Sequence, residues 1–188
     1  YPYILLLSCF NFIPLAILCP FMPRMLAHAA VYRLRAHLRR GGVVAYPTES
    51  SYGLGCLPRH VRGLRRVVRL KGRAQSKGMI VVGADWAQLA PYIAPLSPDQ
   101  LARLATYWPG AVTLLLPASR RVLPMLRGKH RTLAVRLTAH PATVALCRAL
   151  GGALVSTSAN HAGQRPHKTA SACRRAFGHH ALTLSGQV

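Results

Sequence analysis

The chain has 188 residues, of which 51% are hydrophobic, so it can form one domain with a full core, and its length argues against a second independent domain. It carries 25 lysine and arginine residues against three acids, Glu49, Asp85 and Asp99, for a formal net charge of +22. This balance excludes catalysis by paired carboxylates and favours anionic partners such as nucleotides, nucleic acid or anionic lipid. An arginine-rich composition is also produced by genomic bias, so charge alone does not establish RNA binding.

Residues 1–22 are almost wholly apolar, as a signal peptide or a membrane anchor would be. However, the stretch contains three prolines and lacks a basic segment before its apolar run, and the chain starts without methionine. We therefore interpret residues 1–24 as an apolar N-terminal extension upstream of a natural start at Met22 or Met25, with a membrane segment as the alternative. The domain is then expected over residues 25–188.

The first predicted element is an amphipathic helix over residues 27–40, because its apolar residues recur on one helical face. Gly41-Gly42 ends this helix. Residues 42–46 form a predicted buried strand that Pro47 breaks, and two glycines in the following segment allow a sharp turn or close approach to a ligand.

A second predicted helix starts near Val61 and delivers Lys71 and Arg73 at its C-terminal end. A short strand follows over residues 79–82. Asp85 can cap a helix through Ile93.

Ser97-Pro-Asp-Gln100 is typical of a capping box with proline at the first helical position, and it starts a predicted helix to about Tyr107. Strands are then expected over residues 112–116 and 132–137, on either side of a long connection. The remaining elements are a helix over 141–150, a strand over 153–156 and a helix over 169–177. Short strands interleaved with helices predict an α/β domain with a mixed sheet.

Two cations, Lys71 and Arg73, lie one residue apart in a segment predicted to be non-helical, with Lys77 shortly after them. A lysine point charge and an arginine fork at this spacing can point at one triphosphate. The alternative is that Lys71 and Arg73 are solvated surface charges.

The segment Ser156-Thr-Ser-Ala-Asn160 places three hydroxyls and an amide directly after an apolar run, where an α/β sheet presents ligand-binding groups. It reads equally well as a turn followed by a helix cap. Arg136 lies in an otherwise apolar strand whose alternation puts it on one face with Thr132 and Ala134. If it faces the core it must find an anion, for which a substrate carboxylate is a natural partner.

The sequence contains no P-loop, no dinucleotide-binding glycine fingerprint and no H-E-x-x-H motif. The five cysteines contain no C-x-x-C pair, which argues against a zinc ribbon or a disulfide framework and favours a reduced, cytoplasmic protein. No protein-bound metal is therefore expected, and Mg²⁺ would be coordinated mainly by substrate phosphates. The chemistry left open is positioning and electrostatic stabilisation, as in nucleotidyl transfer.

Five motifs occur in order: Tyr-Pro-Thr-Glu-Ser-Ser-Tyr-Gly-Leu-Gly from Tyr46, Leu-Lys-Gly-Arg from Leu70, Trp-Pro-Gly from Trp108, Leu-Ala-Val-Arg-Leu-Thr-Ala-His-Pro from Leu133, and Ser-Thr-Ser-Ala-Asn from Ser156. Over about residues 29–186 the chain thus resembles the YrdC/TsaC family of threonylcarbamoyl-AMP synthases, in their short single-domain form. The resemblance implies a YrdC-like twisted mixed β-sheet flanked by helices, with an open basic concave site. It also implies synthesis of L-threonylcarbamoyladenylate and pyrophosphate from L-threonine, bicarbonate or CO2, and ATP. The adenylate would feed a downstream tRNA threonylcarbamoyl transferase complex for the t6A modification of tRNA.

The resemblance also assigns site residues, with Lys71 and Arg73 as the catalytic pair. The residues implied for ATP binding are Lys71, Arg73, Lys77, Thr132, Ser158, Asn160 and Pro166. Those implied for threonine binding are Thr48, Ser50, Arg136 and Ser156.

Two departures from the family pattern matter. Ala74 stands where a proline commonly follows the K-x-R signature, and the chain stops at Val188, before a segment that the family continues with, so we expect a C-terminally truncated domain. The alternative function is a non-catalytic module that binds double-stranded RNA or tRNA through a basic surface. A third reading, the related domain of hydrogenase-maturation carbamoyltransferases, is disfavoured because the C-x-x-C pairs of that assembly are absent.

Overall fold

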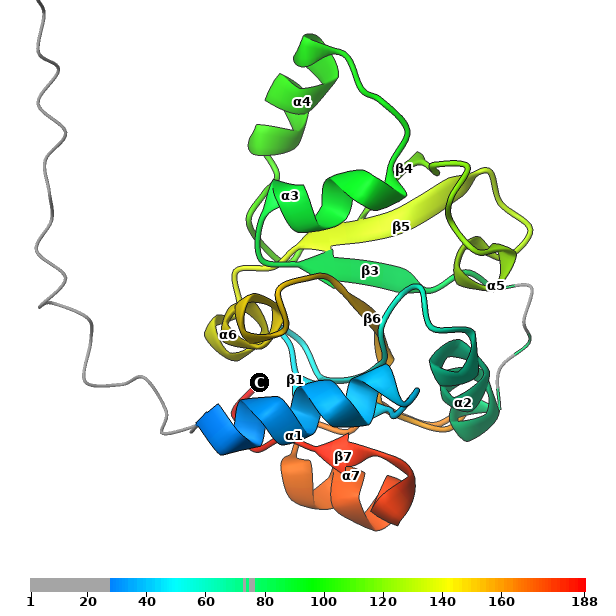
Figure 1. The fold of residues 1–188 in the computed structure, drawn as a ribbon, viewed down its shortest axis with the longest axis vertical. Coiled ribbons are helices and arrows are strands. Elements are labelled where there is room, and N and C mark those ends of the chain that lie inside the picture. Colours follow the sequence, from blue (N-terminus) through cyan, green and yellow to red (C-terminus); the bar gives the residue numbers. More distant parts are fainter. Residues whose placement is uncertain (1–27, 73, 75–76) are drawn as a thin grey trace, which may run out of the picture.

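The computed structural model describes residues 28–72, 74 and 77–188 (Figure 1). Its described part is built around a mixed sheet of seven strands in the order β4-β5-β3-β6-β2-β1-β7. The strands are β1 Val44–Pro47, β2 Tyr52–Gly55, β3 Ile80–Gly83, β4 Leu114–Pro117, β5 Thr132–Leu137, β6 Leu154–Ser158 and β7 Leu182–Thr183.

The helices alternate with these strands along the chain. They are α1 His28–Arg39, α2 Val61–Lys71, α3 Trp86–Leu89, α4 Pro98–Ala105, α5 Pro124–Arg127, α6 Pro141–Leu150 and α7 Ala170–Phe177, with 3₁₀ turns at Ala90–Tyr92 and Gly178–His180. Strand β3 pairs parallel to β5 and β1 parallel to β7, whereas the other neighbours are antiparallel. The predicted α/β fold with a mixed sheet is therefore confirmed.

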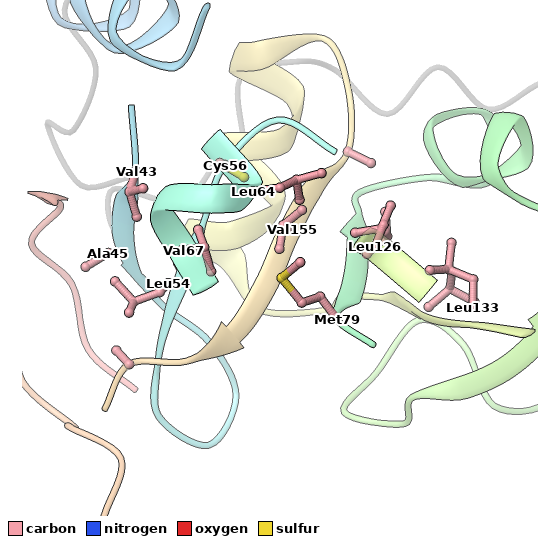
Figure 2. Close-up of a cluster of buried hydrophobic side chains, with 14 of the residues drawn as sticks. Val43, Ala45, Leu54, Cys56, Leu64, Val67, Met79, Leu126, Leu133 and Val155 are labelled. Atoms are coloured by element: carbon pink, nitrogen blue, oxygen red, sulfur yellow. The ribbon is translucent and has the colours of Figure 1, made fainter. Parts of the chain in front are cut away.

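Two apolar clusters hold the helices on opposite faces of the sheet, because successive residues of a strand point to opposite sides. Val43, Val155 and Leu54 belong to a cluster that also takes in side chains of α2, α5 and α7 (Figure 2). Tyr46 and Leu154 are sequence neighbours of residues in the first cluster and point to the opposite face of the sheet. They belong to a second cluster with side chains of α1 and α6. Burial of both faces explains why the sequences of the central strands contain continuous apolar runs.

The predicted helix boundaries follow local capping signals. Helix α1 ends at Arg39, just before Gly41, whose φ of 76° lies in the left-handed region that favours glycine. Helix α4 begins with both halves of the capping box between Ser97 and Gln100. These predictions are confirmed, because short-range hydrogen bonds determine where such helices begin and end.

No strand was predicted in the glycine-containing segment after Pro47, where the glycines were expected to allow a sharp turn or close approach to a ligand. Residues Tyr52–Gly55 form strand β2, which pairs with β1 and β6. A Cβ at Gly55 would lie 2.1 Å from the Val155 carbonyl oxygen, so glycine here permits close packing of the strand rather than a turn. Strand β1 includes Pro47, and β6 runs on to Ser158, two residues beyond the predicted end.

Three other elements differ from the prediction. Strand β4 begins two residues later than predicted, and α5 and β7 were not predicted. The apolar extension predicted over residues 1–24 lies outside the described residues. Among the described residues, no helix is long and apolar enough to cross a membrane.

Candidate functional site

Strand β6 lies between β2 and β3, so the two polar motifs become neighbours in the sheet. Ser158 is paired with Gly53 of β2, and Ser156 with Ile80 of β3. A cavity of about 260 Å³ opens beside these pairs. This first cavity is lined by Thr48, Glu49, Ser50, Ser51, Tyr52, Gly53, Gly78, Ile80, Val82, Arg136, Ser156, Thr157 and Ser158.

One ion pair faces the first cavity. Arg136 Nη1 donates to Glu49 Oε2 at 3.0 Å, and both side chains are mostly shielded, with exposures of 18% and 16%. Thr113 Oγ1 accepts from Nε and Nη2 of Arg136 at 2.9 and 2.8 Å. Thr138 Oγ1 donates to Glu49 Oε1 at 2.5 Å. The guanidinium and the carboxylate are thus each fixed by a threonine from a different segment.

These contacts keep Glu49 ionised. Burial on its own would raise the pKa of this carboxyl group, but hydrogen bonds from Thr138 and from the backbone, together with the charge of Arg136, outweigh it and lower the pKa below its ordinary value. A carboxylate at this position therefore accepts hydrogen bonds at neutral pH.

Lys71 connects the motif that starts at Leu70 with the motif that starts at Ser156. Its Nζ donates to the carbonyl oxygen of Ser158 at 2.6 Å, to Ser158 Oγ at 2.9 Å and to Asn160 Oδ1 at 2.6 Å. Ser158 Oγ in turn donates to Asn160 Oδ1 at 2.7 Å. Lys71 is buried, with 6% of its surface exposed, so the end of α2 is fixed to the end of β6.

A second cavity, of about 310 Å³, adjoins the first, since Gly78 lines both. Cationic side chains dominate its polar lining. The second cavity is lined by Lys77, Gly78, Met79, Leu115, Arg127, His130, Thr132 and Ala134.

The structure brings most of the predicted site residues into these two cavities. Of the four predicted threonine-binding residues, all line the first cavity: Thr48, Ser50, Arg136 and Ser156. Of the predicted ATP-binding residues, Ser158 lines the first cavity, and Lys77 and Thr132 line the second. What these residues bind stays a prediction.

The remaining predicted residues lie elsewhere. Lys71 and Asn160 are held together beside Ser158, and Pro166 is exposed and lines neither cavity. Arg73 lies outside the described residues. The reading of Ser156 and Ser158 as a turn and helix cap is wrong, because both belong to strand β6.

Sequence reasoning missed several residues of the site. Glu49 stands inside the first motif, yet only the hydroxyl groups there were given roles, and the anion expected beside Arg136 was a substrate carboxylate alone. The scarcity of acids was the signal that could have drawn attention to Glu49. Thr113 and Thr138 carry no such signal, because their contacts with Arg136 and Glu49 depend on long-range folding.

Neither a metal site nor a reactive thiol is found in the described part of the chain. No group of three or more His, Cys, Asp or Glu side chains there could hold a metal ion. Cys56, Cys147 and Cys173 are buried, and burial raises the pKa of the first two thiols to about 12. The two cavities offer hydroxyl groups, one ion pair and cationic side chains.

The mixed sheet thus gathers hydroxyl groups, one ion pair and cationic side chains beside its central strands. The family model described as telomere recombination, which covers the Sua5, YciO and YrdC proteins, matches residues 36–187. The chain therefore belongs to the Sua5/YciO/YrdC family.

Individual relatives agree with this membership. A Chromobacterium violaceum protein named threonylcarbamoyl-AMP synthase is 56% identical over 89% of this chain and 86% of its own length. A Laribacter hongkongensis protein of the same name is 56% identical over 89% of this chain and 90% of its own length.

Among solved structures, the chain is similar to P. abyssi Sua5 complexed with L-threonine, with a TM-score of 0.78 and 28% identity. The match covers 87% of this chain and 48% of that one, so the chain spans about half the length of that structure.

Proposed function

We propose that the chain is a threonylcarbamoyl-AMP synthase, a nucleotidyltransferase that makes L-threonylcarbamoyladenylate. The observation that carries the proposal is 56% identity to proteins of that name along most of their length. The fold supports it, since the P. abyssi structure similar to this chain contains L-threonine. L-Threonine, bicarbonate and ATP then give the adenylate, pyrophosphate and water; with CO2 in place of bicarbonate, no water forms.

We assign L-threonine to the first cavity, because about 260 Å³ suits a single amino acid and the lining combines hydroxyl groups with a guanidinium. Arg136 would receive the substrate carboxylate in a charge-assisted pair. Thr48, Ser50 and Ser156 would provide the neutral hydrogen bonds.

We assign ATP to the second cavity and its rim. Lys77 and Thr132 line it, and Arg127 and His130 add donors there that sequence reasoning did not predict. The other residues proposed for ATP are Lys71, Arg73, Ser158, Asn160 and Pro166. Mg²⁺ would enter with the phosphates.

The proposed chemistry has two steps. The threonine amine, after losing a proton, forms a bond from nitrogen to the carbon of CO2 or bicarbonate, and bicarbonate releases water. A carbamate oxygen then attacks the α-phosphorus of ATP, and pyrophosphate leaves with the electron pair of the broken P–O bond. Two anions must approach each other in the second step, so the cations near Gly78 would lower the repulsion.

The adenylate is a reactive mixed anhydride, so an acceptor must consume it quickly. We propose that a tRNA threonylcarbamoyl transferase complex in the cytoplasm does so, in the t6A modification of tRNA. Direct contact with tRNA or double-stranded RNA is a second candidate, favoured only by the net charge of +22.

Incubation with ATP, bicarbonate and labelled L-threonine tests the proposal. We expect pyrophosphate release that requires all three substrates, together with a labelled adenylate. Arg136→Gln should raise the threonine requirement far more than the ATP requirement. Salt-sensitive RNA binding without pyrophosphate release would favour the binding module instead.

A further inference from the structure

The first cavity carries both signs of charge, which is unusual in a chain with three acids. The other two acids serve helix starts: Asp85 caps α3 through the Gln88 backbone N–H, and Asp99 lies in the first turn of α4. Glu49 has no such local role. Its place in the cavity, beside Arg136, therefore calls for a different explanation.

Counting hydrogen-bond capacity shows that the ion pair can still bind a ligand. A guanidinium has five N–H donors, and three hydrogen bonds of Arg136 go to Thr113 and Glu49, which leaves one N–H on each terminal nitrogen. A carboxylate has about four acceptor positions, and one side-chain donor reaches each oxygen of Glu49. Both groups line the cavity with capacity to spare.

We propose that Glu49 binds the α-ammonium group of the substrate and thereby selects an amino acid over its hydroxy-acid analogue. An L-amino acid is a zwitterion, so its carboxylate would pair with Arg136 while its ammonium group pairs with Glu49. This inference rests on the proposed function, and it gives the cavity a second charged subsite. The ionised state of Glu49 at neutral pH agrees with this role.

A role of Glu49 limited to holding Arg136 in place has other consequences than a role in binding the ammonium group. If Glu49 only positions Arg136, its loss weakens every ligand that carries a carboxylate. If it binds the ammonium group, its loss weakens only ligands that carry that group. Glu49→Gln separates the two, because glutamine keeps the size and the oxygen acceptor but removes the charge.

The experiment compares three ligands by titration calorimetry: L-threonine, 2,3-dihydroxybutanoate, which lacks the ammonium group, and threoninol, which lacks the carboxylate. Glu49→Gln should weaken L-threonine and threoninol by roughly tenfold to a hundredfold, the loss of one charge-assisted hydrogen bond, and leave the hydroxy acid unchanged. Arg136→Gln should weaken L-threonine and the hydroxy acid but not threoninol.

Thr113→Val is the matched control, since it removes the acceptor that fixes Arg136 without touching Glu49. It should weaken L-threonine and the hydroxy acid alike. Equal weakening of all carboxylate ligands by Glu49→Gln, or unchanged threoninol binding, would overturn the inference. If the hydroxy acid binds too weakly to measure, threoninol alone decides.

Failure of the proposed function looks different from failure of this inference. A wild-type chain that binds no L-threonine contradicts the proposed function. A wild-type chain that binds it, with a Glu49→Gln variant of unchanged ligand selectivity and native circular dichroism, contradicts the role of Glu49 alone.

Discussion

Replacement of Lys71 by methionine tests whether this signature residue holds the fold together as well as serving the site. Methionine keeps the length of the side chain but removes the ammonium donor of three hydrogen bonds to Ser158 and Asn160, whose oxygens keep only the bonds between these two residues. Each lost hydrogen bond from a charged donor costs about 1.5–3 kcal/mol, while the ammonium no longer suffers desolvation, which offsets part of the loss. We expect a net destabilisation of about 3 kcal/mol, or about 6–12 °C in Tm for a domain of this size.

Thermal unfolding followed by circular dichroism measures this difference, with Lys77→Met as the matched control. Lys77 is exposed, so its replacement should change the free energy of unfolding by no more than about 0.5 kcal/mol. Equal Tm values for the Lys71→Met variant and the wild type would refute the reasoning, because a buried ammonium with these contacts cannot be lost without consequence.

Three further predictions concern a glycine, two thiols and Glu49. Gly55→Ala should prevent folding or lower Tm by more than Lys71→Met does, since the new Cβ meets the Val155 carbonyl at 2.1 Å, whereas Gly152→Ala, with nothing within 4 Å, should not. Iodoacetamide at pH 8 should leave Cys56 and Cys147 unmodified until denaturant is added, as peptide mass spectrometry can show, because burial raises the pKa of both thiols to about 12. The lowered pKa of Glu49 implies stability that is present above its ordinary pKa of about 4.3 and lost as pH falls through the folded value. Urea unfolding should therefore show a stability advantage of the wild type over Glu49→Gln at pH 7 that shrinks by pH 3; a constant difference would contradict this.

The sequence predicts those elements whose ends depend on nearby residues. The capping box at Ser97 and the left-handed Gly41 are examples, since each is satisfied within one helical turn. Strand β5 was also predicted with its correct ends, and its alternation correctly places Leu133 and Val135 in the core. Local signals are therefore sufficient where the stabilising contacts are themselves local or strictly periodic.

Strand β2 shows where local signals fail. Two of its four residues are glycines, which have low strand propensity, and their use is explained by close approach of Gly55 to the Val155 carbonyl and of Gly53 to Ser156 Oγ. Strand β7 has two residues and exists through its parallel pairing with β1. Both elements depend on partners distant in the chain, which a single sequence does not reveal.

The position of the candidate site follows from the same alternation that builds the core. On β6, Leu154, Ser156 and Ser158 share one face of the sheet. Leu154 packs in the apolar cluster that includes side chains of α1 and α6, whereas Ser156 and Ser158 line the first cavity. The change from leucine to serine along this face therefore marks the boundary between the apolar cluster and the first cavity. Lys71 holds that end of the strand, so the contacts that shape the site also stabilise the sheet.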